Sequence, residues 1–173
     1  HLARRLSADP QTCEQVLMTG LVHDIGKIGI PDHVLLKPGK FTQEEFGVIA
    51  QHAEIGYKIL SGSDAELLKV AAVIAYTHHE RFDGTGYPRK LQGEAIPLEG
   101  RIAAIADAFD ALTTQRVYKP AFEVSHAIEL MLKHRSEHFD PELLDIFVAS
   151  TEELVRIHDQ YADRVHSNTF RQP

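Results

Sequence analysis

Histidine and aspartate residues recur along this chain in a pattern that suits a metal site. The chain holds 11 histidines among 173 residues, about one in sixteen. Neutral imidazoles together with carboxylates form a mixed nitrogen and oxygen ligand set, which suits iron, manganese, nickel or zinc and differs from a thiolate site. The candidate ligands are His23, Asp24, His52, His78, His79 and Asp107.

The spacing of these residues allows two cations to share a ligand. Neighbouring side chains on a helix diverge by about 100°, so His23 and Asp24 can serve different ions, and a carboxylate can bridge two cations. Asp107 and Asp110 are three residues apart and share a helix face, so one can bind metal while the other orients a ligand from behind. Two ions about 3.5–4 Å apart would activate water and hold a phosphate in line.

A second His-Asp pair in the chain serves as an internal control. His158-Asp159 lies in a polar C-terminal stretch without a glycine break, which is typical of a solvated helix face. By contrast, His23-Asp24 follows an apolar helix, and Asp107 interrupts the apolar run 102–106, where a carboxylate is costly unless it is paired or metal-bound. The remaining histidines are interpreted as structural or surface residues: His33, His126, His134, His138 and His166.

The N-terminal elements that must position these residues are predicted to be helices. Apolar spacing predicts a helix over 11–24, which Gly26 and Gly29 interrupt. Capping-box patterns at residues 42–45 and 63–66 predict helices that run to about residues 60 and 79. The intervening segment 27–41 is irregular, with a short strand piece expected near 28–30.

The second half of the chain is also predicted to be helical. Glycine and proline make residues 80–96 a loop, and Pro97 suits the first position of a helix that carries the apolar run 102–112. Further helices are predicted over 123–133 and from 141 to about 164. The fold class is therefore all-α, a helical bundle with a metal centre in its core.

Composition narrows the class of protein. With 43% hydrophobic and 25% charged residues, the chain is too apolar for disorder, and residues 1–173 fit a single domain. Cys13 stands alone, so a disulfide scaffold is excluded, and a reducing cytoplasmic compartment is expected. There is no membrane-spanning run or signal sequence. The net charge of −7 argues against binding to long nucleic acid.

Five motif segments occur between residues 20 and 120 in a recognisable order. They cover residues 23–32, 36–40, 52–56, 78–88 and 101–118, and they include the triplet Gly86, Tyr87 and Pro88. In these segments the chain resembles the HD-GYP subgroup of the HD phosphohydrolase superfamily, which is named after that triplet. The resemblance covers more than half of the chain, so residues 20–120 are expected to form the motif-bearing core and residues 121–166 the C-terminal helices.

The resemblance implies an activity and a cofactor. Members of the subgroup are all-α and hydrolyse the second messenger cyclic di-GMP to the linear dinucleotide or on to GMP. The expected cofactor is a pair of divalent metal ions, iron or manganese first, with nickel or zinc as alternatives. The ligands implied are those already named, with Asp24 as the bridge: His23, Asp24, His52, His78, His79 and Asp107.

The resemblance also implies substrate contacts and partners. Lys27 matches a lysine that touches the scissile phosphate, and Arg116 and Lys119 match residues that hold substrate phosphates. The loop 86–88 is associated with the architecture of the site and with contact to diguanylate cyclase domains. Without the resemblance, Arg116 and Lys119 fit equally a basic helix C-terminus.

One departure from the family pattern concerns the N-terminus. Members with three metals carry a glutamate and a histidine on a helix well upstream of the His-Asp motif. In this chain His1 does not fall in that register, and Glu14 is too close to His23. The expectation is therefore at most two metals. Because the chain begins at His1 without methionine, we also expect a fragment of a longer regulatory protein with an upstream sensory or receiver domain.

Two other functions remain open from the sequence. The chain could be an HD-type phosphohydrolase of another nucleotide, which the loop 86–88 with Arg116 and Lys119 argues against. It could also be a non-catalytic module that binds the dinucleotide or a cyclase, which the complete ligand set argues against.

Overall fold

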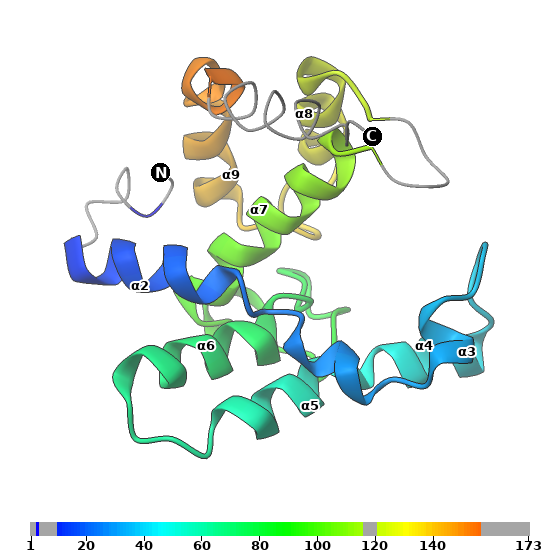
Figure 1. Cartoon of the computed structure of the whole chain (residues 1–173). Helices are drawn as coiled ribbons and strands as arrows, with labels where there is room; N and C mark the ends of the chain where they lie inside the picture. The colour runs from blue at the N-terminus through cyan, green and yellow to red at the C-terminus, as the bar shows by residue number, and fades with distance from the viewer. Residues whose placement is uncertain (1–2, 4–9, 116–120, 157–173) are drawn as a thin grey trace, which may run out of the picture.

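Helices joined by turns make up the described part of the chain, and the predicted all-α class is confirmed. The structure is a computed structural model that describes residues 3, 10–115 and 121–156 (Figure 1). The α-helices are α2 (Pro10–Gly20), α3 (Asp32–Leu35), α4 (Gln43–Ile49), α5 (Gln51–Leu60), α6 (Glu66–Thr77), α7 (Leu98–Thr113), α8 (Val124–Leu132) and α9 (Pro141–Val148), and the 3₁₀ helices are η1 (Ile25–Gly29) and η2 (Gly93–Ala95).

The N-terminal elements differ from the prediction in three places. The first helix ends at Gly20, so the His-Asp motif lies in the turn that follows it. The strand piece expected near 28–30 is wrong, because η1 occupies Ile25–Gly29, and α3 adds one helical turn to a segment predicted as irregular. The helix predicted from residue 42 to 60 is divided at Ala50 into α4 and α5.

The two predicted capping boxes have different outcomes. At Thr42 the box is present, because its hydroxyl accepts the Glu45 N–H while the Glu45 carboxylate accepts the Thr42 N–H. At Ser63 it is absent: the hydroxyl accepts from the Ala65 N–H two residues later, a local turn that competes with helix capping. The helix consequently begins at Glu66, with Ala65 as its N-cap.

The C-terminal helices follow the prediction more closely. The helix α8 lies within one residue of its expected range at each end, and Pro97 is the N-cap of α7 rather than its first residue. The helix α9 starts at Pro141, as expected, but ends at Val148, and a further helical turn covers 151–156. The rest of that predicted helix lies outside the described residues.

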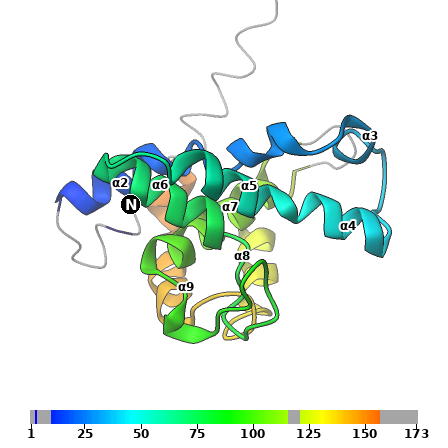
Figure 2. The same ribbon diagram turned by 90° about the horizontal axis from the view of Figure 1, so that it is seen from below.

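A large apolar cluster lies between α7, α8 and α9. Its fully buried members come from all three helices, because each turns one apolar face inward at helical spacing. The cluster includes Ile102, Ile105, Phe109, Ala127, Ile128, Met131, Phe139, Leu143, Leu144 and Phe147. In Figures 1 and 2, α7 runs between α6 on one side and the pair α8 and α9 on the other. The opposite side of α7 is therefore available to position a site.

Close backbone contacts hold the N-terminal elements together. A Cβ atom at Gly26 would lie 1.9 Å from the carbonyl oxygen of His52, and one at Gly56 would lie 3.2 Å from Cβ of Ala75. Only glycine at position 26 allows η1 to approach α5 this closely. The resulting contact brings the turn before η1 onto the first turn of α5.

Candidate metal centre

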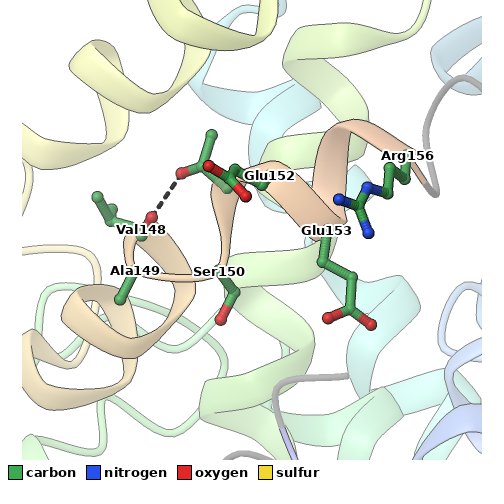
Figure 3. A pocket seen from close by; sticks show the side chains of 7 residues that line it. Val148, Ala149, Ser150, Glu152, Glu153 and Arg156 are labelled. Atoms are coloured by element: carbon green, nitrogen blue, oxygen red, sulfur yellow. Dashed lines mark hydrogen bonds between the residues drawn. The ribbon is translucent and has the colours of Figure 1, made fainter.

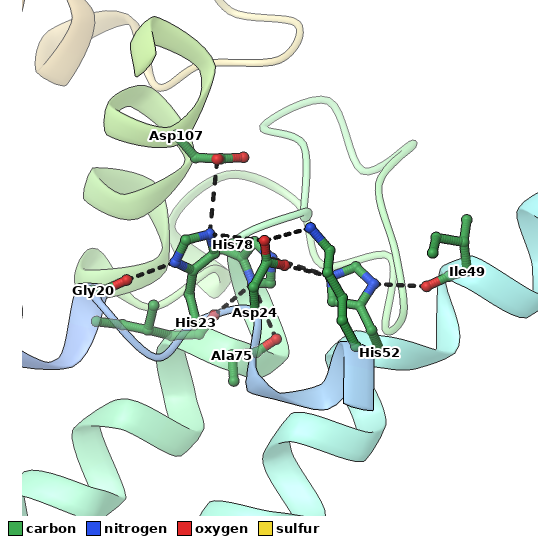
Figure 4. Close-up of polar contacts among 10 residues, drawn as sticks. Gly20, His23, Asp24, Ile49, His52, Ala75, His78 and Asp107 are labelled. Carbon is green, nitrogen blue, oxygen red and sulfur yellow. Dashed lines mark hydrogen bonds and ion pairs between the residues drawn. The ribbon is translucent and has the colours of Figure 1, made fainter. Parts of the chain in front are cut away.

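The candidate ligands converge from four separate segments of the chain (Figure 4). His23 and Asp24 come from the turn before η1, and His52 comes from α5. His78 is the C-cap of α6 with His79 directly after it, and Asp107 lies on α7. All six therefore lie in one region, although they are far apart along the chain.

Asp24 lies at the middle of this group. Its Oδ1 atom is 3.3 Å from Nε2 of His52 and 3.8 Å from Nε2 of His78. Its other oxygen, Oδ2, is 3.4 Å from Nε2 of His23. The two oxygens of one carboxylate thus face different imidazoles, which is the geometry that a bridging ligand requires.

The ligand atoms divide into two sets that share Asp24. Ligand atoms of Asp24, His52, His78 and His79 all lie within 4.8 Å of one another. On the other side, Nε2 of His23 is 3.8 Å from Oδ1 of Asp107. The structure therefore brings four candidate ligands together in one group that could hold a metal ion, with His23 and Asp107 next to it.

Three of the histidines are oriented by backbone carbonyls. The Nδ1 atom of His23 lies 2.6 Å from the Gly20 oxygen, and that of His52 lies 2.6 Å from the Ile49 oxygen. Nδ1 of His78 lies 3.0 Å from the Ile74 oxygen. Because a carbonyl only accepts, each Nδ1 must carry the proton, which leaves the Nε2 lone pair free to bind metal.

Unsatisfied buried atoms provide an independent test of whether this group fits a cation. Nε2 of His23 and Oδ1 of Asp24 are buried and have no hydrogen-bond partner among the described residues. Buried polar atoms normally have a partner, and those that lack one call for an explanation such as a bound ion. A third such atom, Nε of Arg101, lies outside the ligand set on a side chain that pairs with Asp140, whereas the other two lie together in the cluster, so the site fits a metal.

The electrostatics of the group favour deprotonated ligands. Burial lowers the pKa of His78 from its ordinary 6.5 to about 4, and burial lowers the pKa of His52 and of His79 as well. For Asp24, burial opposes ionisation, but the contacts with His23 and Lys27 outweigh it and hold the pKa well below its usual range. Neutral imidazoles and an ionised carboxylate are the forms that bind metal.

His23 differs from the other histidines because its position favours the protonated form. The contact with the Asp24 carboxylate raises the pKa of His23, against the opposing effect of burial. In the metal-free chain, a protonated His23 imidazole next to the Asp24 carboxylate is therefore favourable. Lys27 places a second positive charge there, since its ammonium contacts Oδ2 of Asp24 directly. The carboxylate thus attracts positive charge from two side chains.

The Gly86-Tyr87-Pro88 loop lies against the histidines. The Tyr87 ring is 4.9 Å from the His79 ring and 6.4 Å from the His52 ring, measured between centroids. The peptide bond between Tyr87 and Pro88 is cis. On its other side, Tyr87 meets Phe46 of α4 edge-on, with centroids 5.6 Å apart. Phe46 has no role in the sequence-based prediction, because no local sequence signal links it to a loop so much further along the chain.

Three predicted site residues are not brought to the cluster by the described part of the structure. Asp110 is exposed and accepts a hydrogen bond from Thr114 at 3.1 Å, rather than orienting a ligand. Arg116 and Lys119 lie outside the described residues. The control pair His158-Asp159 does so as well.

A hollow on the surface lies away from this centre, next to the end of α9. Ser150, Glu153 and Arg156 are among the residues that line it (Figure 3). None of the candidate ligands borders it, and its lining residues do not form a group that suits metal chemistry.

None of the described helices is long and apolar enough to cross a membrane.

Comparison with known proteins identifies relatives over most of the chain. Residues 1–143 match the HD domain family. The chain is 47% identical, over 89% of its length, to a cyclic di-GMP phosphodiesterase of Vibrio cholerae, of which it covers 32%. It is 45% identical, over 93% of its length, to the cyclic di-GMP phosphodiesterase response regulator RpfG of Xanthomonas campestris, of which it covers 43%.

Other relatives have a different substrate in their names. The chain is 42% identical, over 82% of its length, to 3'3'-cGAMP-specific phosphodiesterase 2 of Vibrio cholerae, of which it covers 27%. The crystal structure of a cyclic GMP-AMP specific phosphodiesterase of the same organism, V-cGAP3, superposes with a TM-score of 0.63 over 90% of this chain and 41% of that one, at 19% identity. That likeness establishes the fold. The chain spans less than half the length of these relatives.

Proposed function

Because this chain belongs to the HD domain family, we propose that it is a metal-dependent phosphodiesterase that hydrolyses cyclic di-GMP. The observation that carries this proposal is the Asp24-centred cluster, in which two buried ligand atoms lack any partner among the described residues. The names of the relatives at 47% and 45% identity support cyclic di-GMP as the substrate.

The proposed centre holds two divalent ions that share Asp24. His52, His78 and His79 with one oxygen of Asp24 would hold one ion, and His23 and Asp107 with the other oxygen would hold the second. When bound, such ions supply Lewis acidity, which lowers the pKa of water and stabilises charge on phosphoryl oxygens. The ligand set suits iron or manganese first, and nickel or zinc next.

Lys27 is proposed to have two successive partners. Its ammonium contacts Oδ2 of Asp24, the oxygen that the second ion would need. From the same position beside the cluster, the ammonium would be available to hold an oxygen of the scissile phosphate. A lysine ammonium suits this task because it is a mobile point charge. Lys27 would thus neutralise the charge of the Asp24 carboxylate in the metal-free chain and the charge of a phosphate oxygen in the substrate complex.

Arg116 and Lys119 are proposed to hold the phosphates of the substrate. The dinucleotide is a dianion and the chain carries a net charge of −7, so attraction must come from local positive charge. An arginine offers a two-pronged contact to a phosphate. Each charge-assisted contact contributes about 1.5–3 kcal/mol. The product is the linear dinucleotide or GMP.

Hydrolysis of 3'3'-cGAMP is the second candidate, because a relative at 42% identity carries that specificity in its name. The two substrates share the phosphodiester chemistry and differ in one base. The metal centre therefore does not discriminate between them, and side chains at the edges of the site must do so.

A turnover assay on a panel of cyclic dinucleotides, with metal content measured on the same sample, tests the proposal. We expect two ions per chain and fastest hydrolysis of cyclic di-GMP. Faster hydrolysis of 3'3'-cGAMP would favour the second candidate. Metal without turnover on any cyclic dinucleotide would contradict the assignment as a phosphodiesterase, and three tightly bound ions would contradict the binuclear centre.

A further inference from the structure

Glu80 is a buried acid that directly follows His78 and His79. It is 2% exposed, and it has no place in the ligand set described above. Its two carboxylate oxygens accept backbone hydrogen bonds, one from the Arg89 N–H at 2.7 Å and one from the Leu91 N–H at 3.0 Å. A buried carboxylate that accepts two backbone donors ties distant chain segments together. Here it ties the end of the histidine segment to the loop after Pro88.

The same loop is held against the histidine segment at two further points. The Tyr87 N–H donates to the His79 carbonyl at 3.2 Å. A Cβ atom at Gly86 would lie 2.3 Å from the Arg81 nitrogen and 2.6 Å from Cα of Glu80, so only glycine permits this approach. The loop is therefore fastened to residues 79–81 on both sides of Tyr87.

His79 is oriented differently from the other three histidines. The Nδ1 atoms of His23, His52 and His78 lie on backbone carbonyls, whereas the His79 ring has no hydrogen bond within the described residues. Its surroundings are other rings: Tyr87 at 4.9 Å with 31° between the planes, His52 at 5.0 Å and His78 at 4.0 Å. Of these, Tyr87 is the one that is not itself a candidate ligand. Packing against Tyr87 thus replaces the missing hydrogen bond.

We propose that Glu80 is a positioning residue for the metal centre. It holds the loop so that the Tyr87 ring keeps His79 in the orientation that binds metal. The inference rests on the proposed metal centre and adds to it the means by which the fourth histidine is oriented. The side chain must offer two acceptor oxygens, because both face N–H donors, and an amide would place its own NH₂ group against one of them.

Asp140 provides a matched control for a substitution at Glu80. It is also a buried carboxylate, 6% exposed, and its Oδ1 atom accepts two backbone N–H groups, those of Glu142 at 2.9 Å and Leu143 at 3.2 Å. It caps α9 and pairs with Arg101 beside the apolar cluster. Asp140→Asn makes the same carboxylate-to-amide change away from the loop and the histidines: Oδ1 can still accept the two N–H groups, while the new NH₂ group faces Arg101.

The experiment titrates the metal-free full chain with Co²⁺ and records both the affinity and the visible absorption spectrum. For Glu80→Gln we expect an affinity at least tenfold lower and a changed spectrum, the usual effect of losing a residue that supports a metal ligand. For Asp140→Asn we expect a lower melting temperature with the affinity and spectrum of the wild type. Wild-type affinity and spectrum in a folded Glu80→Gln would overturn the proposal.

Tyr87→Leu and the double variant test whether Glu80 acts through the tyrosine. If it does, Tyr87→Leu alone weakens Co²⁺ binding at least tenfold, and Glu80→Gln adds little to it, because coupled residues are not additive. Fully additive losses would overturn the mechanism. A Tyr87→Leu chain that binds Co²⁺ like the wild type would overturn it even if Glu80→Gln fails to fold. Failure of the proposed metal centre has a different signature, since the wild type itself would then bind no Co²⁺. Failure of the phosphodiesterase assignment alone would show as absent turnover with the Co²⁺ results unchanged.

Discussion

The two buried regions of this molecule are built on different principles. Around α7, α8 and α9 the buried residues are large and apolar, and the buried carboxylate there, Asp140, is paired with Arg101 at 2.6 Å and caps α9. Around η1, α5 and α6 the half-buried Asp24 carboxylate and the imidazoles are close together, and two of their buried atoms lack a hydrogen-bond partner in the described structure. Nε of Arg101 also lacks a hydrogen-bond partner in the described structure, but it stands alone in its region. In the other region the two unpartnered atoms lie together among side chains that can bind metal, which indicates a bound ion.

The two regions also differ in the size of the side chains that pack at their contacts. Large side chains such as Phe109 and Phe147 meet edge to face, 5.2 Å between centroids, and fill the space between the C-terminal helices. In the other region Gly26 and Ala53 allow backbones to approach, so that side chains from distant segments can meet. A substitution in the first region should change stability, and one in the second should change metal binding.

The largest expected effect comes from Asp24→Ala. This change removes the one carboxylate whose two oxygens face different histidines, so we expect loss of both metals and of all hydrolysis. Metal analysis and turnover of the purified variant measure this. The exposed His126→Ala should change neither. Two ions retained in Asp24→Ala would contradict the bridging role.

Leu144→Ala should have the opposite profile. Leu144 is fully buried in the apolar cluster, and truncation there costs about 2–5 kcal/mol of unfolding free energy through lost burial and a cavity. Denaturant unfolding measures the loss. The folded fraction should keep the wild-type metal content, and Leu132→Ala, 40% exposed, should change stability far less. Loss of metal from folded Leu144→Ala would contradict the conclusion that the apolar cluster contributes to stability and not to metal binding.

Acid should destabilise both regions of the metal-free chain. Burial lowers the pKa of His78 and of His138 to about 4. The unfolded chain then takes up protons that the folded chain does not, so stability is lost as the pH falls from about 6.5 to 4. His138→Phe should abolish about 3 kcal/mol of this loss while Co²⁺ affinity at neutral pH is unchanged. Unfolding measured across this pH range tests it, with His126→Phe as the control; identical profiles for wild type and His138→Phe would disprove it.

Gly26→Ala sharpens the comparison because it removes no ligand. The added methyl group would meet the His52 carbonyl oxygen at 1.9 Å, and such overpacking costs about 1–3 kcal/mol. It must also move Asp24 away from His52, so we expect weaker Co²⁺ binding. Gly47→Ala on α4, with open space around it, should instead leave binding unchanged and stabilise the helix by about 0.5–1 kcal/mol. Wild-type Co²⁺ affinity in Gly26→Ala would show that this contact does not position the ligands.

The sequence by itself determined the helical class and the residues that form the cluster. Apolar spacing places the helices, and the capping box at Thr42 begins α4 as expected, because these signals are local. Where a local signal competed with another, the prediction failed. The β-branched residues at 28 and 30 suggested a strand, but the turn that Gly26 makes against α5 produces η1 instead. At Ser63 a two-residue turn won over the helix cap.

Only the tertiary structure decided how the ligands are grouped. Spacing along the chain could not show that Asp24 turns one oxygen to His52 and the other to His23, or that Asp107 faces His23 while Asp110 faces Thr114. The role inferred for Glu80 was equally invisible, because its partners lie nine and eleven residues further along a loop without regular periodicity. The sequence specifies which side chains are present, but the direction in which each one points depends on how backbone segments distant in the sequence pack together.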